Sequence, residues 1–484
     1  MTSESHQYDT KEAILFSNGL KSWAAAMELL NCNTKIALEL IDASRICAPH
    51  FISTQRKKFQ RSMIKTNSRV SLLRHSKLPN HSILNRNIII LHAFAKGYKE
   101  NIFPSILLGK NDLASIVHCR LSSRLGSQVF PFRQIKFRDF YRFSSISIKA
   151  LRFAQTSLNS RIKTIYIYNG RDVIEATFVK VAKGKGIRVI FLERGSKNNS
   201  WQTFHKSPHY HPEWWKLITE FSSEESSVSE LNKKRREEFA KAKLSGVDTY
   251  FGKVWNQGFN EIGNTITGKF ALFLSSSTTE FSPFEEFNYN PSSFKDQFEA
   301  VLRLAEILGQ NGIRLVVRRH PNSVGADWKD REEPYWQRVI QEPNVIYFGP
   351  NEKISSYSLL EKAERVYVWK SSMGYESLLL GKPTFTLCSA KWSWNQEFWA
   401  LNDEQIRDSI TKFQNRNIVE NTLVPYGDFM GNSGIESKLF QSINKNYLTL
   451  KTGETIQNLA LQKIRSKTEE IYYKYLIRKP KRNS

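Results

Sequence analysis

Apolar and polar positions alternate along much of the chain in a way that predicts strands and helices in turn. The clearest case is "TIYIYNGR" (164–171), a short apolar run that ends in a turn and predicts a buried strand. "DVIEATFVKVAKGKG" (172–186) has the apolar spacing of a helix and ends at glycines, and "IRVIFLERGS" (187–196) predicts the next strand. Strand, helix and strand in this order indicate a βαβ unit of a parallel sheet.

The same alternation returns after a Gly- and Asn-rich stretch at 250–268. "PSSFKDQFEAVLRLAEILGQNG" (291–312) predicts a helix with one apolar face, with Ser293 and Asp296 as a capping pair and Gly312 as its stop. The predicted strands of this second block are "KFALFLSSS" (269–277), "IRLVV" (313–317), "NVIYFGP" (344–350), "RVYVWKSS" (365–372) and "PTFTLCS" (383–389). "SSYSLLEKAE" (355–364) and "MGYESLLLGK" (373–382) predict short helices between them.

The remaining segments complete a two-unit prediction. "AILFSNGLKSWAAAMELL" (13–30) indicates a strand, a turn and a helix, and "NIIILHAF" (87–94) a buried strand. The charged stretch 222–246 predicts a solvated helix at the edge of the first unit. The fold class is therefore α/β. We expect a first domain at 1–255, a second at 256–430, and a C-terminal helical, basic tail at 431–484.

The charge of the chain is concentrated in one region. The formal net charge is +25 over 484 residues, and residues 45–163 hold 23 Lys and Arg against three acids, a net charge of +20. The end of the chain, "KYLIRKPKRNS" (474–484), is also basic. This pattern fits either a surface that attracts polyanions, such as nucleic acid, acidic lipid or acidic glycan, or a solvated basic surface.

Cysteine usage and hydropathy indicate a reduced, cytoplasmic protein. The four cysteines, Cys32, Cys47, Cys119 and Cys388, have neither metal nor disulfide spacing and fit free thiols. The N-terminus lacks the basic and apolar regions of a signal peptide, and the apolar runs are far shorter than the ~20 residues that span a bilayer. We expect a cytoplasmic protein, at most held at the inner face of the membrane.

Polar residues collect where strands of the second unit end. Ligands of open parallel sheets bind outside the carboxyl ends of the strands. Three such loops, "SSSTTE" (275–280), "RRHPN" (318–322) and "KSSMGYE" (370–376), carry hydroxyls, cations and a glycine that opens a helix. Together they predict a phosphate site. Its candidate residues are Ser276, Ser277, Arg319, His320, Ser371, Ser372 and Gly374, with Glu376 as an acceptor for a substrate hydroxyl and Arg318 on the other face of the strand.

These motifs resemble those of bacterial capsule and surface polysaccharide biosynthesis proteins. The resemblance rests on "FLSSSTTEF", "VVRRHPN" and "SSYSLLEKAERVYVWKSSMGYESLLLGKPTFTL", with "IYNGR" and "FLERGS" in the first half. It implies a glycosyltransferase fold of the GT-B type, with two Rossmann-like domains facing a cleft. The His-Pro and Ser-Ser pairs are similar to the donor-phosphate motifs of sialyltransferases and capsule Kdo transferases, which use CMP-sugars. Many relatives have Gly-Ser-Thr at 370–372, so Lys370 either adds charge or points to solvent.

The resemblance also implies roles for individual residues. His320 would stabilise the departing nucleotide, Ser371 and Ser372 would bind its phosphate, and Glu376 would hold a donor hydroxyl. GT-B enzymes typically need no metal, so no metal site and no cofactor besides the nucleotide-sugar substrate are expected.

The first half is expected to supply the acceptor side. Its strand-end candidates are Asn169, Arg171 and Asp172, and Glu193 is the candidate base that deprotonates an acceptor hydroxyl. Glu193 can equally be a loop carboxylate paired with Arg194 or Arg171. For His209 and His211 in "FHKSPHYHPEWW" (204–215), a surface aromatic loop is favoured over a metal site. The aromatic run "KWSWNQEFW" (391–399) fits either a sugar-stacking platform or packing at the interdomain hinge.

The leading hypothesis is a glycosyltransferase that acts on a surface polysaccharide or lipid-linked glycan, with the basic segment and tail held at anionic lipid. A related alternative is a polyol-phosphate transferase of the teichoic-acid type. From other classes, a basic nucleic-acid-binding protein and a catalytically inactive assembly subunit stay open. The sequence names neither the sugar, the nucleotide nor the acceptor.

Overall fold

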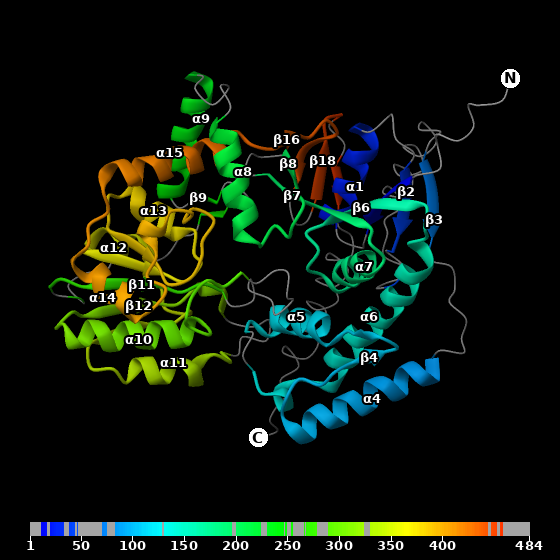
Figure 1. Cartoon of the computed structure of the whole chain (residues 1–484), viewed down its shortest axis with the longest axis horizontal. Coiled ribbons are helices and arrows are strands. Elements are labelled where there is room, and N and C mark those ends of the chain that lie inside the picture. The colour runs from blue at the N-terminus through cyan, green and yellow to red at the C-terminus, as the bar shows by residue number, and fades with distance from the viewer. Residues whose placement is uncertain are drawn as a thin grey trace, which may run out of the picture.

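A computed structural model describes the protein over residues 11–16, 20–32, 38–43, 46, 70–74, 83–127, 130–195, 200–223, 230–245, 247–248, 253–254, 266, 268–277, 289–323, 330–443, 447–452 and 455–457. Over these residues the chain forms two α/β units that lie side by side (Figure 1). Each unit is built on a largely parallel sheet with helices between its strands. The predicted α/β class with two Rossmann-like units is confirmed.

The first unit contains a seven-stranded sheet in the order β16-β8-β7-β6-β1-β2-β3. The five strands from β7 to β3 in this order pair in parallel, whereas β8 and β16 at the edge run antiparallel to their neighbours. The strands are β1 (Lys11–Phe16), β2 (Leu38–Asp42), β3 (Val70–Arg74), β6 (Ile162–Tyr168), β7 (Arg188–Arg194), β8 (Ser200–Phe204) and β16 (Ile435–Glu436). The predicted βαβ unit of 164–196 is thus present as β6, α7 (Val173–Gly184) and β7.

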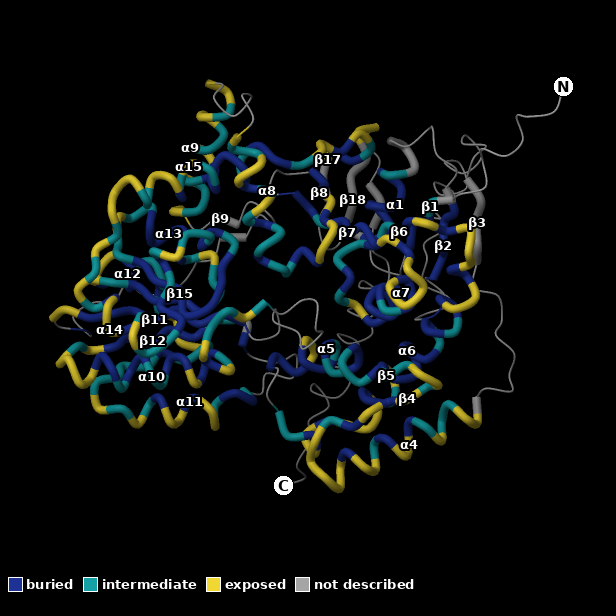
Figure 2. Tube along the Cα trace, viewed as in Figure 1, coloured by how far each residue is buried: buried dark blue, intermediate teal, exposed yellow. Residues whose placement is uncertain are grey.

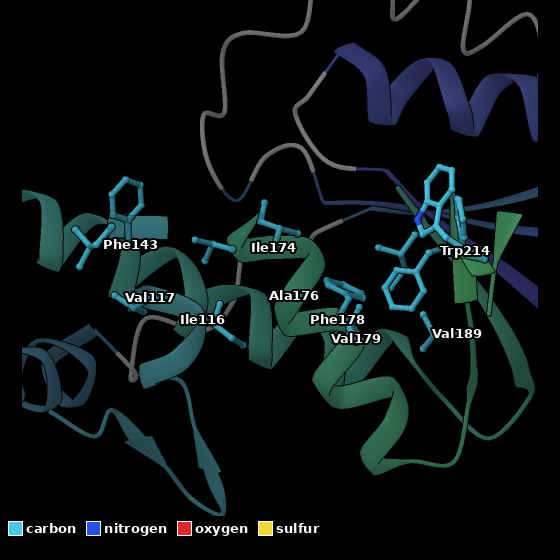
Figure 3. Close-up of a cluster of buried hydrophobic side chains, with 14 of the residues drawn as sticks. Ile116, Val117, Phe143, Ile174, Ala176, Phe178, Val179, Val189 and Trp214 are labelled. Carbon is cyan, nitrogen blue, oxygen red and sulfur yellow. The ribbon is translucent and has the colours of Figure 1, made fainter. Parts of the chain in front are cut away.

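Helix α7 packs on strands β6 and β7 of this sheet, and α5 and α6 pack on α7. Figure 3 shows part of the cluster, in which Ile116 of α5, Phe178 of α7 and Val189 of β7 belong to one buried group. In the part of the first unit that the structure describes, the other helices are α1 (Leu20–Cys32), α4 (Ile83–Glu100), α5 (Ala114–Leu125), α6 (Phe137–Ser157), α8 (His211–Ser223) and α9 (Glu230–Leu244), with the short η2 (Phe132–Gln134). Two small hairpins are β4–β5 (Leu107–Leu108, Asn111–Asp112) and β9–β10 (Val247–Asp248, Lys253–Val254).

The strand predicted at 87–94 is wrong, because these residues lie inside helix α4. Ile90 and Ala93 are buried on one face of the helix, whereas Ile88 and Leu91 are more than half exposed. A short apolar run does not distinguish a buried strand from a helix with apolar residues on two faces. The helical spacing of the apolar residues can be recognised only over the longer stretch 83–100, where no Gly or Pro interrupts the first three turns.

The second unit contains a five-stranded parallel sheet in the order β13-β12-β11-β14-β15. The predicted strands are confirmed as β11 (Ala271–Leu274), β12 (Leu315–Arg318), β13 (Val345–Phe348), β14 (Arg365–Val368) and β15 (Thr384–Thr386). The helices are α10 (Gln297–Gln310), α11 (Glu333–Ile340), α12 (Ser356–Lys362), α13 (Met373–Leu379) and α14 (Asp403–Thr411), with η5 (Pro321–Ser323) and η6 (Gln396–Phe398). β11 is the central strand, so the strand ends of β12 and β14 lie on either side of its own.

Helix α10 begins later than the predicted residue 291. Asp296 is its N-cap, and the carboxylate accepts hydrogen bonds from the N–H groups of Phe298 and Glu299, both at 3.0 Å. Ser293 does not cap the helix, because its hydroxyl donates to the carbonyl of Leu401 (2.9 Å). Gly312 follows the helix with φ of 69°, as a C-terminal stop requires.

The segment predicted as a helical tail instead returns to the first unit and forms strands. Helix α15 (Arg416–Asn432) packs against α8 and α9, and β16 pairs with β8. The hairpins β17 (Phe440–Ile443), β18 (Tyr447–Leu450) and β19 (Thr455–Gln457) follow (Figure 1). The buried carboxylate of Glu28 on α1 holds this segment, since it accepts from the Ser437 hydroxyl and the N–H groups of Lys438 and Leu439. Residues 458–484, including the basic end, lie outside the described residues.

Helix α9, predicted as a solvated edge of the first unit, lies between the two halves of the chain. It packs against α15 and α13. Its buried Phe239 contacts the rings of Tyr375 and Tyr426 at 5.9 Å and 6.4 Å between centroids. Among the helices that the structure describes, none is both long enough and apolar enough to cross a membrane.

Candidate active site

The strand ends of the second unit are joined by serine hydroxyls. Ser275 and Ser276 follow the central strand β11 and are buried. Ser275 Oγ accepts from the backbone N–H of His320, beyond β12, at 2.7 Å. Ser276 Oγ accepts from the backbone N–H of Lys370, beyond β14, at 3.1 Å. The central loop therefore fixes the two flanking loops, and the residues that they carry, relative to each other.

Gln297 at the start of α10 fixes the central loop itself. Its amide oxygen accepts from the N–H of Ser276 and its amide nitrogen donates to the carbonyl of Ser276, both at 3.2 Å. The side chain is buried. Because both hydrogen-bonding groups of the Ser276 backbone are satisfied by one residue, the loop has little freedom to rearrange.

Lys370 is directed into the protein rather than into solvent. Its ammonium donates to the carbonyl of Tyr289 (2.8 Å) and lies beside the buried Cys388 thiol. Burial lowers the pKa of Lys370 below the usual range for lysine. Lys370 lines the cavity described below. Of the two interpretations of this residue, the structure therefore favours added positive charge at the site.

Trp392 forms a wall beside the Ser371–Ser372 loop. Its indole N–H donates to the carbonyl of Ser371 (3.0 Å), and its ring packs on Phe398. The ring lies so close to Gly374 that a Cβ at this position would be 2.0 Å from Trp392 Cζ2. Gly374 thus makes room for the indole and is not among the described residues that line the cavity, and its predicted role in phosphate binding stays a prediction.

In the first unit, Glu193 lies at the end of β7 among hydrogen-bond donors. The Tyr168 hydroxyl (3.1 Å) and the N–H of Arg194 (2.9 Å) donate to Oε1, and the Asn169 amide donates to Oε2. Asn169 adopts φ of 57°, a left-handed turn that Asn tolerates better than most residues. The carboxylate is half-buried and is oriented by three groups, one of which is the backbone N–H of its predicted partner Arg194.

The two units meet around a cavity of about 640 Å³. Most of the predicted site residues line it, although they come from loops far apart in the sequence. From the first unit these are Asn169, Arg171 and Glu193, and from the second Ser276, Ser277, His320, Lys370, Ser371 and Ser372. The sequence-based expectation that strand-end loops converge is therefore correct for these residues. Tyr168, Pro208, His209, His211, Lys243, Lys391, Trp392, Tyr426 and Met430 complete the lining.

Three other predicted site residues lie away from the cavity. The fully buried Arg319 guanidinium pairs with Asp330, Glu332 and Glu333 and with the Tyr347 hydroxyl. Glu376 is buried against Tyr357, whose hydroxyl donates to it at 2.6 Å, and lies 4.0 Å from the Lys243 ammonium. Asp172 is the N-cap of α7 and pairs with Arg120 at 3.4 Å. The structure does not bring these three side chains to the cavity, so it gives their predicted roles at the site no support.

The reasons for these misplacements are local. Strand alternation separates the faces of successive side chains, but both Arg318 and Arg319 turn back into the protein. Arg318 donates to the carbonyls of Gly349 and Glu352, while Arg319 reaches the start of α11. Glu376 lies on the face of α13 that meets Tyr357 of α12 and Lys243 of α9. The position of a residue in the sequence does not reveal which partner in the folded protein a long side chain will contact.

His209 and His211 are functional candidates that the sequence reasoning assigned to a surface loop. Both line the cavity, and His211 is buried with its Nδ1 2.9 Å from Ser389 Oγ. Burial, reinforced by Arg171 and Lys391, holds the pKa of His209 well below the usual range for histidine. Burial, reinforced by Lys370 and Lys391, does the same for the pKa of His211. The signal in the sequence was the second His-Pro pair, His211-Pro212.

The cavity has a strongly positive lining. Among the described residues, four basic side chains, Arg171, Lys243, Lys370 and Lys391, line the cavity together with one carboxylate, Glu193. The Lys391 ammonium is held 3.7 Å from the centroid of the Trp214 ring. A partly enclosed site with this balance attracts anions. Over the described part of the chain, no group of three or more His, Cys, Asp or Glu side chains is placed to hold a metal ion.

The aromatic run 391–399 packs at the junction between the units. The Trp399 ring lies 6.2 Å from that of Trp215 on α8, and the Trp215 indole N–H donates to the carbonyl of Ala390 (2.8 Å). These contacts support the hinge-packing interpretation for most of the run. Of the aromatic side chains in this run, only Trp392 is among the residues that line the cavity.

The fold and the cavity thus define a protein of two Rossmann-like units with an anion-attracting site between them. Residues 288–416 match the model of a family described as "Capsule polysaccharide biosynthesis protein". This match covers most of the second unit, from the loop before α10 to the first residue of α15, and includes His320, Ser371 and Ser372. The resemblance predicted from the sequence is confirmed for this part of the chain.

Among solved structures, the chain is similar to the β-Kdo 2,4-transferase KpsC of Thermosulfurimonas dismutans. The two share 15% sequence identity, the match covers 56% of this chain and 79% of that chain, and the TM-score is 0.37. It is also similar to the UDP-GlcNAc 2-epimerase of Neisseria meningitidis bound to UDP-GlcNAc, with 11% identity, coverage of 87% and 97%, and a TM-score of 0.31. No protein of curated function matches the chain significantly in sequence. The fold assignment rests on the strand order of the chain itself.

Proposed function

We propose that the protein is a glycosyltransferase that moves a sugar from a nucleotide-sugar donor to a growing surface polysaccharide or lipid-linked glycan. The observation that carries this proposal is the shared cavity, which brings Glu193 of the first unit together with His320, Lys370 and the Ser371–Ser372 loop of the second. The capsule polysaccharide family match over 288–416 supports the polysaccharide context.

The second unit binds the donor phosphate in this proposal. The hydroxyls of Ser371 and Ser372 and the Lys370 ammonium hold its oxygens. His320 donates a proton or hydrogen bond to the phosphate oxygen as the bond to the sugar breaks. Such donors lower the barrier when they are fixed before the reaction begins. The Ser275 and Ser276 hydroxyls supply this fixation, because they hold the backbone of His320 and Lys370.

The first unit activates the acceptor. Glu193 accepts the proton of the acceptor hydroxyl as this oxygen attacks the anomeric carbon of the donor sugar. Tyr168, Asn169 and the N–H of Arg194 orient the carboxylate for this step. Arg171 Nη1 lies 3.4 Å from His209 Nε2, and both residues line the cavity together with Glu193.

Transfer without a metal ion is part of the proposal. Arg171, Lys370 and Lys391 bring fixed positive charge to the cavity. This charge stabilises the negative charge of the leaving nucleotide in place of a metal cation. We also propose a cytoplasmic location at the inner face of the membrane, where a lipid-linked acceptor is available.

A binding screen followed by a transfer assay tests the function. CMP-, CDP-, UDP- and GDP-linked sugars are added to the full chain, and the melting temperature is followed. A donor present at 100 times its Kd stabilises the folded protein by about 2.7 kcal/mol. Radiolabelled transfer from the donor that binds then gives the activity. Transfer from a CDP-polyol rather than a nucleotide-sugar would establish the polyol-phosphate alternative, and absence of both binding and transfer would contradict the proposal.

A further inference from the structure

Helix α4 displays an apolar stripe to solvent. Leu84, Ile88 and Leu91 follow each other at helical spacing and are 69%, 55% and 53% exposed. The opposite face holds the helix to the body of the protein through the buried Ile90 and Ala93. A surface helix ordinarily presents polar residues to water, so apolar residues on both faces need a second partner.

The stripe continues beyond the helix into a wider surface. Tyr98 in the last turn of α4 is 52% exposed, and Phe137, 41% exposed, lies against Phe94 of the helix with 5.0 Å between ring centroids. Figure 2 shows α4 along the lower edge of the first unit, with exposed residues along its length. We call Leu84, Ile88, Leu91, Tyr98 and Phe137 the α4 surface.

Basic side chains border this surface. Lys96 and Lys99 are exposed on α4 itself, and Glu100 is the only acid of the helix. The Arg133 guanidinium lies 5.9 Å from the centroid of the Tyr98 ring and donates to the carbonyls of Tyr98 and Lys99. Lys136 and Arg138 are exposed on either side of Phe137. From residue 83 to residue 142 the chain carries ten Lys and Arg against three acids.

The three acids of this region neutralise only part of the border. Glu100 is exposed at the end of α4. The Asp139 carboxylate is largely buried and lies 3.3 Å from Arg124 and 3.9 Å from Arg138. Asp112 accepts from the N–H groups of Ile106 and Ala114, both at 2.9 Å, within its own turn. The exposed charge around the α4 surface is therefore predominantly positive.

We infer that the α4 surface docks on an anionic lipid bilayer. The aliphatic stripe enters the boundary between headgroups and acyl chains, and Lys96, Lys99, Arg133 and Lys136 meet the anionic headgroups. Amphipathic helices of this composition lie in the plane of the membrane surface. Charge complementarity selects this occupant, because nucleic acid would use the cations but leave Leu84, Ile88 and Leu91 in water.

Docking would hold the first unit, which activates the acceptor in the proposed function, at the membrane surface. A lipid-linked acceptor in that membrane would then be close to the part of the cavity that the first unit forms. The inference rests on the proposed function only for this biological role. Vesicle binding is measured without donor or acceptor, so failure of docking and failure of sugar transfer are separate results.

Flotation of the full chain with vesicles tests the inference. Vesicles of phosphatidylcholine alone are compared with vesicles that contain about one third phosphatidylglycerol, at physiological salt. The wild-type chain is expected to float with the anionic vesicles and not with the neutral ones. The Ile88→Ser/Leu91→Ser variant should lose affinity for anionic vesicles by about tenfold or more. Both side chains are exposed, so circular dichroism and melting should match the wild type.

Matched controls locate the effect. Leu231→Ser/Phe413→Ser removes two exposed apolar side chains elsewhere, 56% and 74% exposed, and should leave vesicle binding unchanged. Lys96→Gln/Lys99→Gln/Lys136→Gln should weaken binding by about tenfold and reduce its salt dependence. Wild-type binding that the Ile88→Ser/Leu91→Ser change leaves intact would overturn the inference, as would binding of duplex RNA or DNA with no binding of anionic vesicles.

Discussion

The backbone N–H of His320 donates to the hydroxyl of Ser275 at 2.7 Å, across the pair of strands β11 and β12. This contact sets the position of the residue that lies at the centre of the proposed donor site. It joins a strand-end loop to its neighbour through one buried side chain, and Ser276 makes the corresponding contact to Lys370 on the other side. The site is thus assembled by the central loop of the sheet.

Ser275→Ala should slow turnover without removing any group that contacts substrate. The His320 N–H loses its acceptor, which costs about 1–3 kcal/mol of stability for a buried donor, and the imidazole loses its fixed position. We expect kcat to fall about tenfold with little change in donor KM. Ser275→Thr keeps a hydroxyl and should recover most of the loss. Ser223→Ala, whose hydroxyl bonds only within its own helix turn, is the control. Equal losses in the Thr and Ala variants would argue against positioning.

His320→Ala and Glu193→Gln should separate the two halves of the proposed reaction. His320→Ala removes one transition-state donor, so turnover should fall about 10²–10³-fold. Glu193→Gln removes the base, and turnover should fall strongly while the melting shift produced by the donor is retained. His205→Ala, an exposed histidine outside the cavity, is the control for both. Unchanged turnover in either variant would remove the role given to that residue.

The sequence predicted the scaffold and the loops of this site better than the directions of its side chains. Strand ends follow from apolar runs and turns, so Glu193, His320 and Ser371 are found by pattern alone. Arg319 and Glu376 sit in the same loops but turn into the protein, because buried partners such as Asp330 and Tyr357 compete for them. Those partners come from elements that pack only in the folded chain.

His209 and His211 escaped the sequence reasoning for a related reason. Their place in the cavity depends on α8 packing against the loop around Ser389 and Ala390, nearly 180 residues further along. No local pattern contains that contact. The C-terminal strands β16 to β19 pose the same difficulty, because the segment is fixed by pairing with β8 and by the buried Glu28 carboxylate rather than by its own periodicity.

Arg319→Met tests whether this arginine has the structural role that its buried ion pairs indicate. The change leaves Asp330 and Glu332 without their main cation in a buried position, and breaking such a group by removing one partner costs about 3–5 kcal/mol. We expect a large fall in the urea midpoint, while the donor Kd of the protein that remains folded changes little. Arg303→Met on α10, which disrupts a more exposed ion pair with Asp403, should cost far less. A selective loss of donor affinity would restore Arg319 to the binding site.

Gly374→Ala and Gly184→Ala form a matched pair of helix substitutions. At Gly374 the new Cβ would meet the Trp392 ring at 2.0 Å, so the indole must move and the cavity wall with it. Overpacking of this kind costs about 1–3 kcal/mol. At Gly184, at the end of α7, no atom lies within 4 Å of the new Cβ, and Ala should be neutral or stabilising by up to about 1 kcal/mol. Similar melting temperatures for the two variants would contradict the close packing of Gly374 on Trp392.

Acidification should destabilise the protein through the buried His211. Burial and the nearby cations Lys370 and Lys391 lower its pKa in the folded state, whereas the unfolded chain keeps the usual value near 6.5. Below pH 6.5 the unfolded state therefore binds more protons, and stability falls with pH until the folded pKa is reached. One such histidine contributes up to about 1.4 kcal/mol per pH unit. Denaturant midpoints of the wild type and His211→Gln, measured from pH 7.5 to 5, should diverge in this window. The variant at the exposed His205, His205→Gln, should follow the wild type. A His211→Gln curve parallel to that of the wild type would contradict the prediction, because it would show that His211 takes up its proton as readily in the folded state as in the unfolded chain.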